Sequence, residues 1–308
     1  MAGNKSFVAG VGSTNIDLLY YGLDKLPKEG EEVYSKSFSL QLGGGCPATL
    51  INLGRLGVPT KIATELGKDI FSAFAANEFE KAGVTPLNLY KKRGMPLNVT
   101  SAMITANDRT FMSYGNANVE ATKEALEKAY EMCRGAKIVI MQPGEFLPLY
   151  EKLKAEGTVL VFDSGWDDTM SLETYREYLT LADYYTPNQK EALKITGANT
   201  PEQAAEILSD YFQNVVIKLD KNGCLGMQNG KTFIVPPVPN VKCVDSTGAG
   251  DAFLAGFIYG LFHDKPFADC ILFGNITGGK CVTEVGCLRG YLTENTLLQQ
   301  YEILKNNV

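Results

Sequence analysis

The stretch that decides the fold runs from Asp245 to Phe257 and reads DSTGAGDAFLAGF. A short glycine turn, Gly248–Gly250, comes before Asp251 and an apolar run, Ala252–Leu261. Large apolar side chains recur in this run at helical spacing, so it predicts a helix whose first turn contains Asp251. A helix N-terminus offers free N–H groups and the positive end of the helix dipole, and it therefore favours an anion.

Two interpretations of Asp251 follow from these residues alone. In the first, the N–H groups of Gly248, Ala249 and Gly250 hold a transferring phosphoryl group while Asp251 accepts the proton of an attacking hydroxyl. In the second, Asp251 is only an acidic residue that complements the helix dipole. Because short motifs of this kind often arise by chance, the choice depends on the rest of the chain.

Composition narrows the class of protein. The 308 residues allow one large α/β domain with a small accessory unit. The net charge of −6 does not indicate a nucleic-acid surface, and the absence of a long apolar run predicts no membrane span. The N-terminal residues lack a secretory pattern, and none of the seven cysteines forms a CxxC pair, so we expect a cytoplasmic protein with reduced thiols.

Histidine-based chemistry is excluded by composition. The chain has one histidine, His263, so a multi-histidine metal site cannot form, and the position of His263 just past the predicted helix argues against a histidine triad. A general base must then be a carboxylate, Lys, Tyr or Cys.

Strand and helix patterns predict an α/β architecture. Ser6–Val11 predicts a buried strand, and from Thr60 to a strand at 214–219 short apolar strands alternate with helical segments, as in a parallel sheet. Two segments, 18–42 and 98–118, instead show the alternation of antiparallel strands. We therefore expect a separate small sheet beside the parallel one.

Polar residues follow the first strand. Gly10 and Gly12 suggest a dinucleotide fingerprint, but Asn15 stands at the third glycine position and no amphipathic helix follows, which disfavours it. Asp17 lies just beyond the predicted strand, where open α/β sheets place ligand contacts, although a turn aspartate is the alternative. Further along, Asn188 and Glu191 have the spacing of a helix capping box.

Five motifs occur in a fixed order: GSTNID at 12–17, GGGCPA…RLG at 43–57, TPNQKE at 186–191, DSTGAGD at 245–251 and VTEVG at 282–286. In this order they resemble the ribokinase-like (PfkB) family of sugar and nucleoside kinases. The resemblance implies a ribokinase-like three-layer α/β fold with a mainly parallel central sheet and a small β-sheet lid. The lid would comprise 18–42 and 98–118, and the nucleotide- and substrate-binding domain 1–17, 43–97 and 119–308.

The same resemblance implies an ATP-dependent kinase that phosphorylates a hydroxyl of a sugar or sugar-like molecule. Asp251 would be the general base, and Gly248, Ala249 and Gly250 the anion hole. Asn15, Asp17, Gly43 and Gly44 would bind the substrate. Asn188, Glu191, Lys218, Asp220, Gly223 and Asn275 would bind ATP, with Glu191 on Mg²⁺ through water. Asp245, Thr247, Glu284 and Gly286 would frame a monovalent cation, K⁺.

Two positions depart from the family pattern: Ala48 stands where Asn is usual, and Asp220 where Gly is usual. The alternatives are a nucleoside kinase of the same family and a non-catalytic sugar- or nucleotide-binding regulator on this fold. A nicotinamide-dependent oxidoreductase is a more distant one. The resemblance also implies a homodimer formed through the lid.

Overall fold

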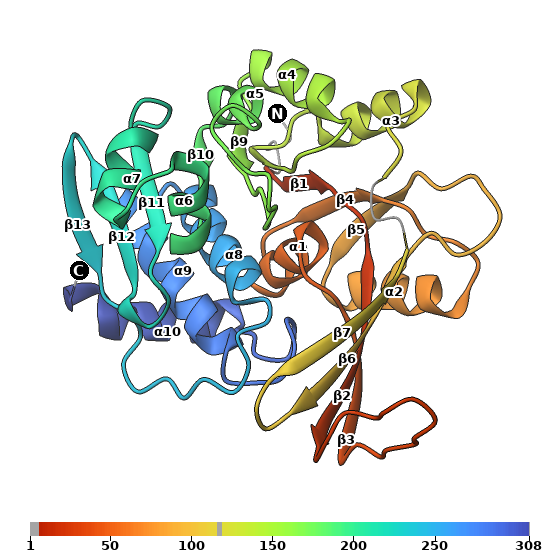
Figure 1. The fold of residues 1–308 in the computed structure, drawn as a ribbon. Coiled ribbons are helices and arrows are strands. Elements are labelled where there is room, and N and C mark those ends of the chain that lie inside the picture. Colours follow the sequence, from red (N-terminus) through yellow and green to blue (C-terminus); the bar gives the residue numbers. More distant parts are fainter. Residues whose placement is uncertain (1–5, 116–118, 308) are drawn as a thin grey trace.

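The computed structural model describes residues 6–115 and 119–307. Its centre is a six-stranded sheet in the order β10-β9-β8-β1-β4-β5, with every neighbouring pair parallel (Figure 1). This confirms the predicted parallel sheet. The strands are β1 (Val8–Val11), β4 (Thr60–Thr64), β5 (Val84–Asn88), β8 (Ile138–Met141), β9 (Val159–Phe162) and β10 (Tyr184–Tyr185).

Helices cover both faces of this sheet and make the three layers. Alternate side chains of β1 enter two different cores, Val8 on one face and Ala9 and Val11 on the other. Both faces are apolar because both are buried, which explains the continuous apolar strands. The first core includes residues of α1 (Cys46–Arg55), α2 (Ile70–Lys81), α8 (Ala249–Phe262), α9 (Phe267–Cys281) and α10 (Glu294–Leu304). The second includes residues of α3 (Lys123–Cys133), α4 (Leu147–Ala155), α5 (Arg176–Leu181), α6 (Gln189–Thr196) and α7 (Pro201–Leu208).

One predicted strand of the parallel sheet belongs elsewhere. The strand expected at 214–219 is β11 (Asn214–Lys218), and it pairs antiparallel with β12 (Cys224–Gln228), which pairs with β13 (Lys231–Val235). Toward the β10 side it forms an isolated parallel bridge between Lys218 and Asn188. Strand periodicity is the same in both pairings, so the sequence pattern did not reveal this difference.

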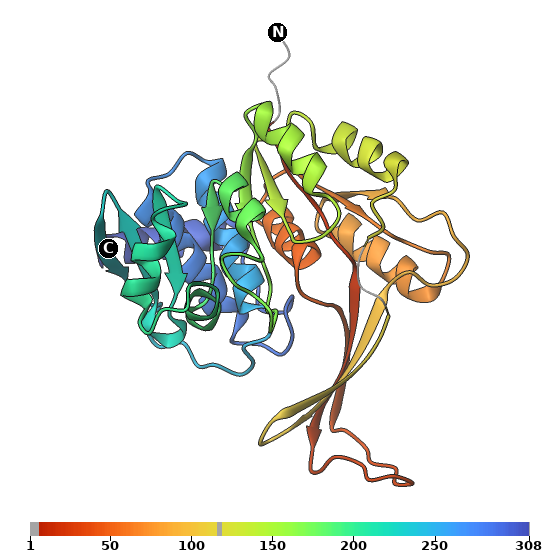
Figure 2. The same ribbon diagram turned by 45° about the horizontal axis from the view of Figure 1, so that its top comes forward.

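The small sheet is four-stranded and mixed. Its order is β3-β2-β6-β7, made of β2 (Asn15–Leu23), β3 (Ser37–Leu42), β6 (Asn98–Thr105) and β7 (Arg109–Tyr114). The pairs β2–β3 and β6–β7 are antiparallel, which confirms the prediction for each of the two segments, and the pair β2–β6, which joins the segments, is parallel. Figure 2 shows this sheet extending away from the α/β layers. Residues 116–118 of the predicted lid lie outside the described residues.

The first strand of the small sheet starts earlier than the sequence suggested. β2 begins at Asn15, so Asn15 and Asp17 are part of this sheet and not of the loop after β1. The chain thus passes from the central sheet to the small sheet through only Gly12–Thr14. Among the helices that the structure describes, none is long and apolar enough to cross a bilayer.

Candidate active site

Polar segments meet where the parallel strands end. Ser13 follows β1, Gln142 follows β8 and Asp163 follows β9 directly, and Asn188 comes soon after β10. Carboxyl ends of parallel strands share one edge of the sheet, which is where open α/β sheets bind ligands. A cavity of about 410 Å³ lies here, and it reaches from the central sheet to the small sheet.

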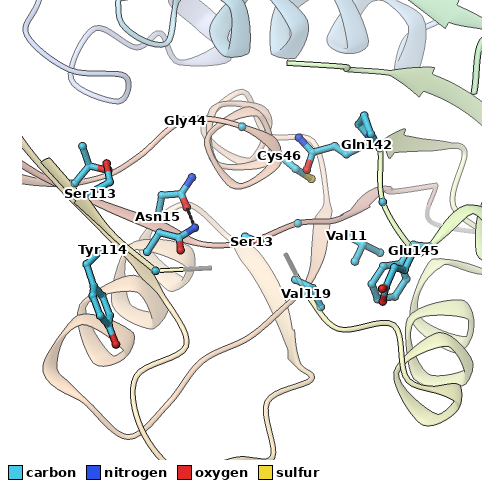
Figure 3. Close-up of a pocket in the computed structure, with 18 of the residues that line it drawn as sticks. Val11, Ser13, Asn15, Gly44, Cys46, Ser113, Tyr114, Val119, Gln142 and Glu145 are labelled. Carbon is cyan, nitrogen blue, oxygen red and sulfur yellow. Dashed lines mark hydrogen bonds between the residues drawn. The ribbon is translucent and has the colours of Figure 1, made fainter. Parts of the chain in front are cut away.

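The cavity has one polar and one mainly apolar side (Figure 3). The small sheet contributes Asn15, Asn98, Thr100, Ser113 and Tyr114, and the Asn98 amide donates a 2.8 Å hydrogen bond to Asn15 Oδ1. Figure 3 shows Gln142 pointing toward Cys46, and Val119 and Val11 on the side away from Asn15. The remaining lining residues from the α/β layers include Gly12, Gly44, Gly45, Glu145, Phe146 and Tyr150.

Asp251 lies directly behind this cavity. A methyl group on Gly44, which lines the cavity, would come within 2.7 Å of Asp251 Oδ2, so only glycine leaves room for the carboxylate. Burial raises the pKa of Asp251 to about 7, the negative charge of Asp163 adds to the rise, and the Gly45 N–H opposes it. A carboxylate with this pKa can accept a proton near neutral pH.

The glycine turn before Asp251 has the expected backbone. Gly248 is the N-cap of α8 with φ of 76°, and α8 begins at Ala249, so the N–H groups of this first turn have no partner within the helix. A methyl group on Gly248 would lie 2.1 Å from Cys287 Cβ, so glycine is required by space as well as by conformation.

A lysine and two further carboxylates lie beside Asp251. Lys218 Nζ would be 3.4 Å from a methyl group on Gly250, and its positive charge lowers the pKa of both Asp251 and Glu191. Glu191 and Asn188 form the predicted capping box of α6, through Asn188 N to Glu191 Oε2 at 2.7 Å and Glu191 N to Asn188 Oδ1 at 3.0 Å. Burial nevertheless raises the pKa of Glu191, and Asp163 adds to the rise.

The substrate-binding residues predicted from the sequence also meet. Gly43 packs on β2, where a methyl group would lie 2.8 Å from Asn15 Cβ and 2.9 Å from Asp17 Oδ1. Burial raises the pKa of Asp17 to about 6, and the charge of Asp245 raises it further. Ala48, in the position where Asn was expected, is fully buried in α1 and offers no polar group.

Asp245 connects three segments. Its Oδ1 accepts hydrogen bonds from Thr247 N at 2.9 Å and Thr247 Oγ1 at 2.7 Å, and its Oδ2 accepts one from Gly286 N at 2.9 Å. The third segment is the small sheet, because Arg109 Nη1 lies 3.0 Å from Asp245 Oδ1. Arg109 was not among the residues that the sequence singled out.

Three of the residues expected to bind ATP form a group of their own. Asn275 Nδ2 donates to the carbonyls of Val235 and Pro236, and a methyl group on Gly223 would lie 2.3 Å from Val235 O. Asp220 has a positive φ of 52°, which explains why glycine suits this position. None of these contacts reaches Asp251.

Sequence reasoning missed several residues of this site. Gln142, Glu145 and Asp163 come soon after buried strands, so the rule that ligands bind at strand ends could have found them. Asn98, Ser113 and Arg109 carry no such signal, because the pairing of β6 and β7 with β2 brings them to the cavity region.

Comparison with known proteins agrees with this geometry. Residues 5–294 match the pfkB family carbohydrate kinase profile. A ribokinase of Arabidopsis thaliana is 28% identical over 294 residues, covering 90% of this chain and 76% of the relative. A 5-dehydro-2-deoxygluconokinase of Clostridium perfringens is 26% identical over 285 residues, covering 82% of this chain and 81% of the relative.

The fold is also found among solved structures. The Arabidopsis thaliana ribokinase complexed with ribose and ATP superimposes with a TM-score of 0.81 at 24% identity, covering 96% of this chain and 98% of that one. The family match extends over nearly the whole chain and includes every motif described above. The chain belongs to the pfkB family of carbohydrate kinases and is a phosphotransferase that acts on a sugar hydroxyl.

Proposed function

We propose that this protein transfers the γ-phosphoryl group of ATP to a hydroxyl of an uncharged monosaccharide. The observation that carries the proposal is the partly buried carboxylate of Asp251, which lies between the polar cavity and the ammonium group of Lys218, beside the N-terminus of α8. Asp251 would accept the proton of the sugar hydroxyl. The N–H groups of Gly248, Ala249 and Gly250 and the ammonium of Lys218 would stabilise the charge that develops on the phosphoryl group.

A divalent cation fits the carboxylates on the phosphate side. Asp163 and Glu191 supply the oxygen ligands that Mg²⁺ prefers. Within the described ranges, no three Asp, Glu, His or Cys side chains are close enough to hold a metal ion by themselves. Mg²⁺ would therefore be held jointly by water, the phosphates and carboxylates such as Glu191. When bound, it neutralises phosphate charge during transfer.

The charges of the residues that line the cavity favour an uncharged acceptor. The lining residues that the structure describes include Glu145 and five polar neutral residues of the small sheet, but no Lys, Arg or His. A carboxylate or phosphate on the acceptor would find no opposite charge and would lie near Asp17, Glu145 and Asp251, which disfavours it. Asn15, Asp17 and the backbone at Gly43 and Gly44 would bind the hydroxyls of a neutral sugar.

A nucleoside is the second candidate acceptor. Phe146, Tyr150, Val11 and Val119 give the cavity an apolar side that suits a base or a deoxygenated sugar edge. A non-catalytic regulator is disfavoured, because a partly buried carboxylate with a raised pKa costs stability when it ionises, and such groups concentrate at catalytic sites.

A panel of acceptors tests the proposal. ATP consumption with Mg²⁺ is measured for neutral sugars, sugar acids, sugar phosphates and nucleosides. Turnover confined to neutral sugars is the expected result. Turnover of nucleosides alone would favour the nucleoside as the acceptor. Turnover of sugar acids alone would refute the inference that the acceptor is uncharged, and no turnover of any acceptor would refute the kinase activity.

Nucleotide and cation binding complete the proposal. ATP would contact Asn188, Glu191, Lys218 and the segment around Asp220, Gly223 and Asn275. K⁺ framed by Asp245, Thr247, Glu284 and Gly286 remains a prediction of the resemblance, and Arg109 competes with it for Asp245. The exposed outer face of the small sheet would contact a second copy of the chain.

A further inference from the structure

The side chain of Arg109 connects the small sheet to the segment that leads into α8. Arg109 is the first residue of β7 and follows the turn at the tip of the β6–β7 hairpin. Its Nη1 lies 3.0 Å from Asp245 Oδ1 and also donates to Thr247 Oγ1. The ion pair is partly sheltered, since the side chains of Arg109 and Asp245 are 37% and 12% exposed. Figure 1 shows the hairpin tip turned toward the part of the molecule that carries α8.

The partners of Arg109 are next to the glycine turn. Thr247 directly precedes Gly248, the N-cap of α8. Asp245 holds Thr247 through two hydrogen bonds and the segment after α9 through Gly286 N. One carboxylate therefore fixes the direction from which the chain enters the turn, and Arg109 is the side chain from the small sheet that contacts it.

The same strand reaches the acceptor cavity. Arg109 and Ser113 are four residues apart on β7, so both point to the same face of the sheet and lie roughly 13 Å apart. Ser113 lines the cavity, together with Thr100 opposite it on β6. One end of β7 thus lines the cavity while the other contacts the segment before Gly248.

We propose that Arg109 is a positioning residue for phosphoryl transfer. It couples the contact between the small sheet and the acceptor to the geometry of the glycine turn at Gly248–Gly250. This inference rests on the proposed function. An acceptor that contacts the small sheet would hold β7 in place, and Arg109 would then hold Asp245 and Thr247. Misplacing a catalytic group by about 1 Å can lower a rate a hundredfold, so a contact to Thr247, the residue before the turn, is enough to matter.

Arg109 also bears on the monovalent cation. Asp245 Oδ1 accepts from two Thr247 donors and faces the guanidinium, and Oδ2 accepts from Gly286 N, so both oxygens have partners. A K⁺ ion on Oδ1 would lie next to the guanidinium and be repelled by it. Arg109 therefore supplies a built-in positive charge at the carboxylate where the sequence resemblance places K⁺.

The test compares three variants with the wild type. Arg109→Ala removes the contact, Arg109→Lys keeps the charge but loses the planar fork, and Lys36→Ala is the control. Lys36 forms a 2.7 Å ion pair with Asp24 at the edge of the same sheet, with both side chains largely exposed. Each protein is assayed for kcat and KM in K⁺ and in tetramethylammonium at equal ionic strength, and for hydrogen exchange in residues 243–248.

Because Arg109 already places a positive charge at Asp245, the wild type should work at similar rates in both cations, in contrast to the K⁺ site that the family resemblance predicts. Arg109→Ala should lose about 10- to 100-fold in kcat in tetramethylammonium and recover partly in K⁺, with Arg109→Lys in between. Its residues 243–248 should exchange faster, while Lys36→Ala should match the wild type in every measurement.

Other outcomes would overturn the inference. An Arg109→Ala variant with wild-type kcat and wild-type exchange would remove the positioning role. A wild type whose activity requires K⁺ would contradict the claim that Arg109 supplies the positive charge needed at Asp245. A protein that phosphorylates no acceptor would refute the proposed function instead, and the exchange of residues 243–248 would then decide by itself whether Arg109 holds this segment.

Discussion

Asp251 has two properties that conflict at the scale of a single residue. Burial raises its pKa to about 7, which makes it a better base but a costly group to ionise inside the protein. Asp163, which raises this pKa further, follows β9 and comes from a different part of the chain. The site therefore tunes its base with a neighbouring carboxylate as well as by exclusion of water.

Replacing Asp251 by Asn should remove the base and leave the shape. We expect turnover to fall by roughly two to four orders of magnitude, because a positioned acid–base group contributes about that much. Asp264→Asn is the control, since Asp264 lies at the end of α8 in an ion pair with Lys137 and has a positive φ that Asn tolerates. Turnover of Asp251→Asn above about a tenth of the wild type would contradict the proton-transfer role.

The stability of this variant should depend on pH. The folded-state pKa of Asp251 is raised from 3.8 to about 7, so its contribution to stability is present at low pH and is lost as pH rises through 7. Asp251→Asn should therefore be the more stable protein at pH 8, by at most about 4 kcal/mol, and close to the wild type at pH 4. Urea unfolding at both pH values measures this, and an equal difference at both would contradict the raised pKa.

The pH dependence of kcat/KM should report the same group. Because the base must be unprotonated, kcat/KM should fall about tenfold per pH unit below 7 and level off above it. Asp163→Asn removes a negative charge that raises the pKa of Asp251, so the inflection should move to lower pH. Asp264→Asn should leave the inflection unchanged, and an inflection near pH 4 in the wild type would contradict the assignment of the base.

At the scale of the element, the conformation of the turn that starts α8 depends on how closely Gly248 packs against Cys287. Gly248 has a positive φ and lies against Cys287, whereas Gly230 has a similar φ of 72° with nothing within 4 Å of an added methyl group. Alanine substitutions at these two glycines therefore separate the free-energy cost of a left-handed backbone from the cost of a steric clash.

Gly248→Ala and Gly230→Ala should differ in stability and in activity. Gly230→Ala should lower the free energy of unfolding by about 1 kcal/mol, the usual cost of a left-handed residue with a side chain, and stay active. Gly248→Ala should cost at least about 2 kcal/mol more and reduce turnover, since the turn must move away from Cys287. Urea unfolding and turnover are the measurements, and equal effects of the two variants would show that the packing against Cys287 does not matter.

At the scale of the whole molecule, the small sheet leaves apolar side chains in water. Phe38, Met112 and Tyr114 are 52%, 67% and 65% exposed, and the strand registers put them on one face of the sheet. A sheet face of this kind is usually covered by another surface, so the dimer predicted from the family resemblance would form here.

Charges on this face should separate the dimer. We expect the wild type to be a dimer at micromolar concentration, and Met112→Lys with Phe38→Lys to be a folded monomer, because like charges would meet across a two-fold contact. Ile303→Lys is the control, since Ile303 is 74% exposed on α10, away from the small sheet. Light scattering after size-exclusion chromatography measures the mass, and a monomeric wild type would contradict the dimer. A cytoplasmic location stays a prediction.

The sequence alone determined the α8 region and the α/β class. The glycine turn, the apolar period after Asp251 and the capping box at Asn188 are local signals, because neighbouring residues along the chain create them. Their order along the chain was sufficient to predict the family, which the profile match confirms. The buried strands that end next to Ser13, Gln142 and Asp163 also came from local pattern, although only Asp17 near the first of them was singled out.

Only the tertiary structure decided which distant segments meet. Arg109 and Asp245 are separated by 136 residues, and Asn98 and Asn15 by 83. Neither contact has a signature in the sequence, because it depends on how β6 and β7 pair with β2 and on the path of the chain between the sheets. The antiparallel pairing of β11 was missed for the same reason, since a strand's own residues encode its alternation but not its neighbour.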